Sequence, residues 1–188
     1  TVLAPDGTGF PGRMEAALRD KLPTVKVNVN LQLQIKKTAA DVSGDLARIL
    51  EGKQPTLVIW QTGTVDAMRA VDPDDFRTAV DEGVTALQKR GADVALMNLQ
   101  YGPRMETMIT TAPYLDVMRV VAQQHEVPLF DRFAIMHHWN ETGQFDLFNN
   151  SRGIELAKRV HDCLGRALAT FVIEAARIKP AELRTQQE

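Results

Sequence analysis

Polar residues follow an apolar run of the chain and form its first candidate site. The run Leu57–Trp60 contains β-branched and aromatic members, a composition typical of a strand that is buried on both faces. The residues after it can hydrogen-bond a ligand or bring the backbone close to one: Gln61, Thr62, Gly63 and Asp66. In open parallel sheets, ligands bind just beyond the carboxyl ends of the strands. This segment is therefore either a ligand site or a strand-to-helix loop without a site, in which Asp66 only braces the loop.

A second apolar run ends in residues of the same chemistry. Val94–Leu99 predicts a strand, and Asn98 and Gln100 are the polar residues at its carboxyl end. Because a parallel sheet directs all its strand ends the same way, we expect both amides to lie on one rim with residues 61–66. Amides and hydroxyls hydrogen-bond a polar ligand such as a sugar, but they do not readily relay a proton.

Helical and strand periodicities alternate along the whole chain. We expect strands at residues 25–31, 57–60, 94–99 and 127–130, and helices at residues 13–21, 39–50, 73–91, 104–125, 134–139 and 151–171. Thr38–Asp41 has the spacing of a capping box, and Asp72-Pro73 is a strong helix start. Pro113 either kinks the helix at 104–125 or marks its true start. The alternation predicts a parallel sheet with helices on both faces and the Leu57–Trp60 strand at its centre.

The length and composition of the chain are ordinary for a globular protein. We expect residues 1–188 to form one domain with a frayed tail at 180–188, and a further strand upstream of Thr1, because a doubly wound sheet normally begins with a strand. The net charge of -2 gives no electrostatic footprint for nucleic acid, and no apolar run is long enough to span a membrane. Cys163 is the single cysteine, and the His, Cys and acidic spacings show no metal signature, so we expect neither a metal nor another cofactor. The sequence sets neither the oligomeric state nor the compartment, although removal of an upstream signal peptide would place the protein outside the cytoplasm.

Three segments, in their order and spacing, resemble the SGNH hydrolases, also called GDSL-type esterases and lipases. Phe10–Arg13 is similar to the start of the helix after that family's nucleophile loop, and Pro55–Asp66 to the strand that ends in Gly-x-Asn-Asp. Asp131–Phe133 followed by Asp146–Asn149 is similar to the Asp-x-x-His block before the last helix. The resemblance covers nearly the whole chain and implies a flavodoxin-like three-layer α/β/α sandwich. It also implies hydrolysis of an ester or acetyl ester of a small acyl or acylated carbohydrate substrate.

The sequence departs from the family pattern at the catalytic positions. Val65 stands where Gly-x-Asn-Asp has its Asn, and losing one such oxyanion donor typically costs roughly 2.7–4 kcal/mol of transition-state stabilisation. Asn149 stands where the catalytic His is expected, and an amide cannot act as a general base near neutral pH. Asp146, which would orient that His, is in place, and the family's nucleophilic Ser would lie before Thr1.

Two classes of function remain open at this point. An active hydrolase needs an upstream Ser and a base from outside the usual position, for which His137 and His138 are the candidates. The alternative is a catalytically inactive protein of the same fold that binds a ligand or a partner. For the same residues, Asp146 and Asn149 are also typical of a helix start, and the adjacent His137 and His138 point to different faces of a helix and suit surface or packing roles.

Overall fold

The computed structural model describes residues 9–147 and 153–177, which form two compact units. One unit contains the described residues up to Leu31 together with residues 153–177, and the other runs from Gln32 to residue 147. The expected frayed tail lies outside the described residues, and the expectation of one domain stays a prediction.

The first unit is a pair of packed helices, α1 (Phe10–Lys21) and α8 (Gly153–Ala175). Their apolar residues recur every three or four positions and are buried: Phe10, Met14, Leu18, Val160, Leu164 and Leu168. Gly165 lets the two backbones approach closely, because a Cβ atom there would lie only 2.8 Å from the carbonyl oxygen of Phe10. His161 Nδ1 accepts a hydrogen bond from the backbone N–H of Phe10 at 3.1 Å, and it thereby satisfies a donor at the start of α1.

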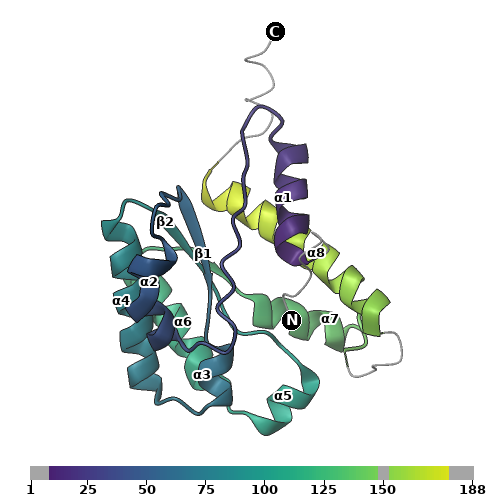
Figure 1. Ribbon diagram of the computed structural model, residues 1–188. Helices are drawn as coiled ribbons and strands as arrows, with labels where there is room; N and C mark the ends of the chain where they lie inside the picture. The colour runs from purple at the N-terminus through teal and green to yellow at the C-terminus, as the bar shows by residue number, and fades with distance from the viewer. Residues whose placement is uncertain (1–8, 148–152, 178–188) are drawn as a thin grey trace. The chain divides into compact units, whose positions relative to one another are not determined.

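The second unit is built on a parallel sheet with the strand order β1 (Leu57–Gln61), β2 (Asp93–Met97) and β3 (Leu129–Phe130). The helices α2 (Ala39–Ile49), α4 (Pro73–Lys89) and α6 (Ala112–Gln124) lie on one side of this sheet (Figure 1). Three short helices follow the carboxyl ends of the strands in turn: α3 (Thr64–Met68), α5 (Pro103–Met108) and α7 (Arg132–Glu141). The segments after all three strands therefore gather at the same end of the sheet.

Several local predictions are confirmed. Thr38 and Asp41 form both hydrogen bonds of a capping box at the start of α2. Asp72 caps α4, because its carboxylate accepts the backbone N–H of Asp74 at 2.8 Å. The helix expected at 104–125 is two helices, and α6 begins beside Pro113, as one of the two interpretations of that proline predicted.

Other predictions of the strands are wrong. Among the described residues, Val25–Leu31 pairs with no strand, and Val25 and Leu31 are 41% and 46% exposed. The described sheet consequently has three strands with β2 in the middle, so Leu57–Trp60 lies in an edge strand and not at the centre. Period-two alternation describes a side-chain pattern that suits a pleated surface, but a strand also needs a partner for its backbone groups. The segment after β1, expected to be a loop, contains the single-turn helix α3.

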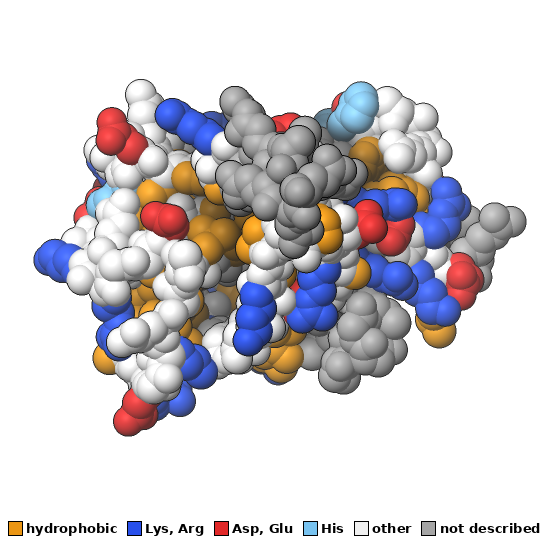
Figure 2. Space-filling view, turned by 90° about the horizontal axis from the view of Figure 1, so that it is seen from above, with side chains coloured by type: hydrophobic (Ala, Val, Ile, Leu, Met, Phe, Trp, Pro, Cys, Tyr) orange, Lys and Arg blue, Asp and Glu red, His pale blue; other side chains and the backbone are white. Residues whose placement is uncertain are grey.

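The surface agrees with the small net charge. On the face that Figure 2 shows, the basic and acidic side chains of the described residues are interspersed. None of the described helices is long and apolar enough to cross a membrane. Within residues 9–147 and 153–177, no group of three His, Cys, Asp or Glu side chains is placed to hold a metal ion.

Candidate functional site

Hydrogen bonds tie together the three segments that leave the carboxyl ends of the strands. The backbone N–H of Gln100, after β2, donates to Thr64 Oγ1 in α3 at 3.1 Å. Arg132 in α7 donates from Nη2 to Gln100 Oε1 at 2.9 Å. The end of β2 is thus connected directly to the segments after β1 and β3. This carboxyl-end rim, defined by Thr64, Gln100 and Arg132, is where the sequence predicted a site.

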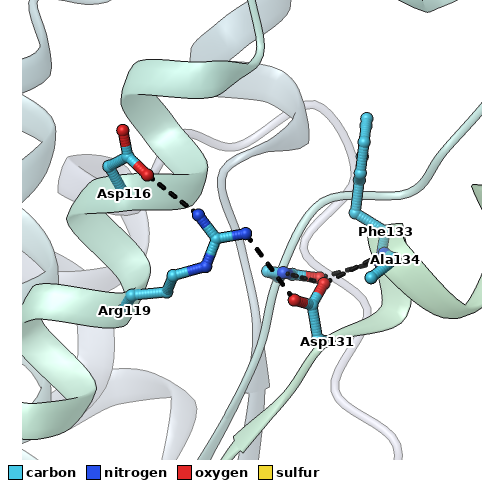
Figure 3. Close-up of polar contacts among 6 residues, drawn as sticks. Asp116, Arg119, Asp131, Phe133 and Ala134 are labelled. Atoms are coloured by element: carbon cyan, nitrogen blue, oxygen red, sulfur yellow. Dashed lines mark hydrogen bonds and ion pairs between the residues drawn. The ribbon is translucent and has the colours of Figure 1, made fainter.

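Asn98 uses its side chain to position α7. Its Nδ2 donates to Asp131 Oδ1 at 2.7 Å, and its Oδ1 accepts the backbone N–H of Phe133 at 3.0 Å (Figure 3). Asp131 Oδ1 also accepts the N–H of Ala134 and so caps the helix. Asn98 is fully buried, and its amide oxygen and nitrogen are both engaged within the protein. Its role in the structure is therefore to hold the start of α7 against the end of β2.

Two ion pairs of Arg119 connect Asp131, and with it the start of α7, to α6. Asp131 Oδ2 lies 3.7 Å from Arg119 Nη2, and Arg119 Nη1 bonds Asp116 Oδ1 at 2.8 Å (Figure 3). Arg119 is about half exposed, so solvent weakens these attractions. The geometry of α7 is consequently fixed mainly by the buried amide of Asn98.

Arg132 was missed as a site residue, although it lies within a segment that carries the family resemblance. The residue is 2% exposed, and burial lowers the pKa of its guanidinium to about 10. At neutral pH it keeps its positive charge, so a buried cation stands at the rim beside Gln100. The sequence carries only a weak signal for this burial, because arginine usually lies at the surface.

The segment after β1 is held by Asp66. Thr62 continues the sheet with a hydrogen bond from its N–H to the carbonyl of Met97, and Gly63 adopts a φ of 92° before α3. Asp66 is 1% exposed, and its Oδ1 accepts the N–H of Ala39, the first residue of α2, at 2.9 Å. Burial raises the pKa of Asp66, and the neighbouring backbone N–H groups oppose that rise. This geometry matches the bracing role that the sequence left open.

Replacing Asp66 by Asn should make the free energy of unfolding less dependent on pH. A carboxyl whose pKa is raised by folding contributes stability below its ordinary pKa of 3.8, and that contribution is lost as the pH rises through the raised value. Asn keeps an oxygen acceptor for Ala39 but does not ionise. We expect the free energy of unfolding of Asp66→Asn, relative to that of the wild type, to increase as the pH rises. Urea unfolding at several pH values from about 4 to 7 measures this difference.

Asp41→Asn is the matched control for this experiment. Thr38 lowers the pKa of Asp41 through the hydrogen bonds of the capping box, so its contribution is lost as the pH falls. The difference in the free energy of unfolding between Asp41→Asn and the wild type should therefore become smaller as the pH falls. If the stability difference between Asp66→Asn and the wild type also became smaller as the pH falls, folding would not disfavour the ionised form of Asp66.

The two candidate histidines differ in their surroundings. His137 is half-buried: Tyr101 packs edge-on against its ring at 4.9 Å and Phe133 stacks on it at 6.3 Å. Its Nδ1 lies 3.2 Å from Glu141 Oε2, and its Nε2 lies 3.9 Å from Glu106 Oε1. His138 is exposed, as expected for the next residue of a helix. Only His137 is therefore held in a fixed orientation by the aromatic and acidic side chains around it.

The remaining predicted residues are less completely placed. Val65 is half-buried in α3, Gln61 is half-buried at the end of β1, and Asp146 is exposed beside Phe145, whose ring packs on Trp139 at 5.3 Å. Asn149 lies outside the described residues. The sequence contains two serines, Ser43 in α2 and Ser151, which also lies outside the described residues. The described part of the rim therefore carries no serine.

Comparisons with known proteins identify the same architecture. A family model described as the Non-GDSL lipase-like family matches residues 3–178. The structure resembles that of TesA, with a TM-score of 0.70, 19% identity and coverage of 91% of each chain. It also resembles the acetyl xylan esterase AlAXEase, with a TM-score of 0.66, 20% identity and coverage of 89% of this chain and 90% of that one. AlinE4, an SGNH-hydrolase family esterase, gives a TM-score of 0.59 at 19% identity over 88% and 89% of the two chains. No curated protein sequence matches the chain. These likenesses confirm the predicted α/β/α fold of the SGNH type.

Proposed function

Since the chain belongs to the Non-GDSL lipase-like family, we propose that it hydrolyses carboxylic esters at the carboxyl-end rim. The observation that carries the proposal is the convergence of Thr64, Gln100 and Arg132 where the three strands end. Sites in open parallel sheets lie at this place, and a few convergent polar groups fix the orientation of a ligand.

The chemistry of the rim favours a small polar substrate. Amide and hydroxyl groups dominate the residues after the strands, and they suit the hydroxyls of a carbohydrate. The buried Arg132 adds a positive charge that favours the negative charge developing on an ester oxygen during hydrolysis. The likeness to a protein named as an acetyl xylan esterase supports an acetylated carbohydrate as the substrate class.

A second candidate function is ligand binding without turnover. Val65 has no side-chain donor for an oxyanion, and Asn149 cannot serve as a base. A chain with these residues would keep a polar rim and bind a carbohydrate ester while leaving it intact.

Turnover of acetyl esters separates the two functions. We expect the purified protein to release acetate from acetylated xylan and to cleave p-nitrophenyl acetate faster than p-nitrophenyl octanoate. Activity should disappear at the urea concentration at which the tryptophan fluorescence of Trp60 and Trp139 changes, and this would assign the activity to this fold. Retained binding of acetylated xylan without release of acetate would favour the inactive protein.

A further inference from the structure

The His137 ring is held at the carboxyl-end rim by contacts from two directions. Tyr101, which packs on the ring, directly follows Gln100 in the chain, and the backbone N–H of Gln100 is bonded to Thr64. Phe133, one turn earlier on α7, stacks on the ring at 6.3 Å, and its backbone N–H is held by the buried Asn98. The orientation of the imidazole is therefore set by the same network that joins the ends of β2 and β3.

Two carboxylates face the two nitrogens of this ring. Glu141, one turn along α7, has its Oε2 3.2 Å from Nδ1. On the other nitrogen, Nε2 lies 3.9 Å from Glu106 Oε1 in α5. Once Nε2 takes up a proton, both carboxylates stabilise the resulting imidazolium. This arrangement suits a group that must gain a proton during a reaction.

We propose that His137 is the general base of the hydrolysis, with Glu141 as its positioning residue, and this inference rests on the proposed ester hydrolysis. Nε2 takes a proton from water as the water oxygen bonds to the ester carbonyl carbon. The imidazolium returns that proton to the leaving alkoxide as the carbon–oxygen bond of the ester breaks. One water and one ester thus give one acid and one alcohol, and α7 supplies the base that Asn149 cannot.

Among the described residues, the titratable side chains that face His137 are Glu106 on α5, Glu141 on α7 and Tyr101 in the loop between β2 and α5. Burial raises the pKa of Tyr101, so its phenol keeps its proton at neutral pH.

The test compares His137→Asn with matched replacements. His137→Asn should lower kcat by about 10²–10⁴-fold with little change in KM, because the base acts in the chemical step. Added imidazole should restore part of the activity of His137→Ala. Glu141→Gln should keep measurable activity, and its loss should appear in kcat with little change in KM, because Glu141 acts only through His137.

Two further histidine variants complete the comparison. His125→Asn, at the end of α6 beside Asp81, should keep kcat once the folded fraction is confirmed by urea unfolding. Retained kcat in His137→Asn, or loss in His138→Asn or Asp146→Asn instead, would overturn His137 as the base while leaving ester hydrolysis intact. A wild-type protein that turns over no ester would overturn the proposed function and this base together.

Discussion

Gly63→Ala is expected to lower the free energy of unfolding by about 2–5 kcal/mol, through backbone strain and overpacking together. Gly63 has a φ of 92°, a conformation that residues with a side chain rarely adopt. A Cβ atom there would also lie 2.6 Å from Leu99 Cδ1 and 3.2 Å from Phe76 Cζ. Both neighbours are fully buried, so neither has free space into which to move.

Chemical unfolding followed by tryptophan fluorescence measures this effect. Gly44→Ala in α2 is the matched control, because a Cβ atom at that position would meet nothing within 4 Å beyond its chain neighbours and its own helix backbone, and because alanine favours a helix. The control should be neutral or slightly stabilising. Since Gly63 precedes the rim residue Thr64, any folded Gly63→Ala protein should also show reduced ester turnover. Equal stabilities of the two variants would contradict the close packing around Gly63.

Gly165→Ala is expected to lower the free energy of unfolding by about 3 kcal/mol, although alanine is the better helix former. A Cβ atom at this position in α8 would lie 2.5 Å from Arg13 Cβ, 2.8 Å from the carbonyl oxygen of Phe10 and 2.9 Å from the backbone nitrogen of Met14. Two of these three atoms belong to the backbone of α1, and a change of side-chain rotamer cannot move them. The helices must therefore separate.

Arg13→Gly combined with Gly165→Ala tests that explanation. The double variant removes the contact with Arg13 Cβ but leaves the two contacts with the backbone of α1. We expect little recovery of the free energy of unfolding, measured by urea unfolding against Arg13→Gly alone. A full recovery would show that the side chain, and not the backbone of α1, sets the distance between the helices.

Features whose causes lie within a few residues could be predicted from the amino-acid sequence alone. The capping box at Thr38 and the cap at Asp72 satisfy the first N–H groups of a helix with side chains two or three residues away. Pro113 lacks an N–H, so the sequence indicated either a kink or a helix start at this residue, and α6 begins beside it. The alternation of strands with helices then required parallel strands, and their ends placed the polar residues at one end of the sheet.

Which of these polar residues have roles inside the fold depends on contacts between elements that are distant in the chain. Asn98 and Asp66 were expected on an open rim, but Asn98 bonds Asp131, 33 residues away in the chain, and Asp66 bonds Ala39, 27 residues away. Val25–Leu31 has the pattern of a strand without a described partner, since pairing depends on a distant segment. Two partners of His137, Glu106 and Tyr101, likewise come from α5 and from the loop after β2. Sequence spacing reports neighbours within one helix or strand, whereas burial and hydrogen bonding between elements are fixed when the elements pack.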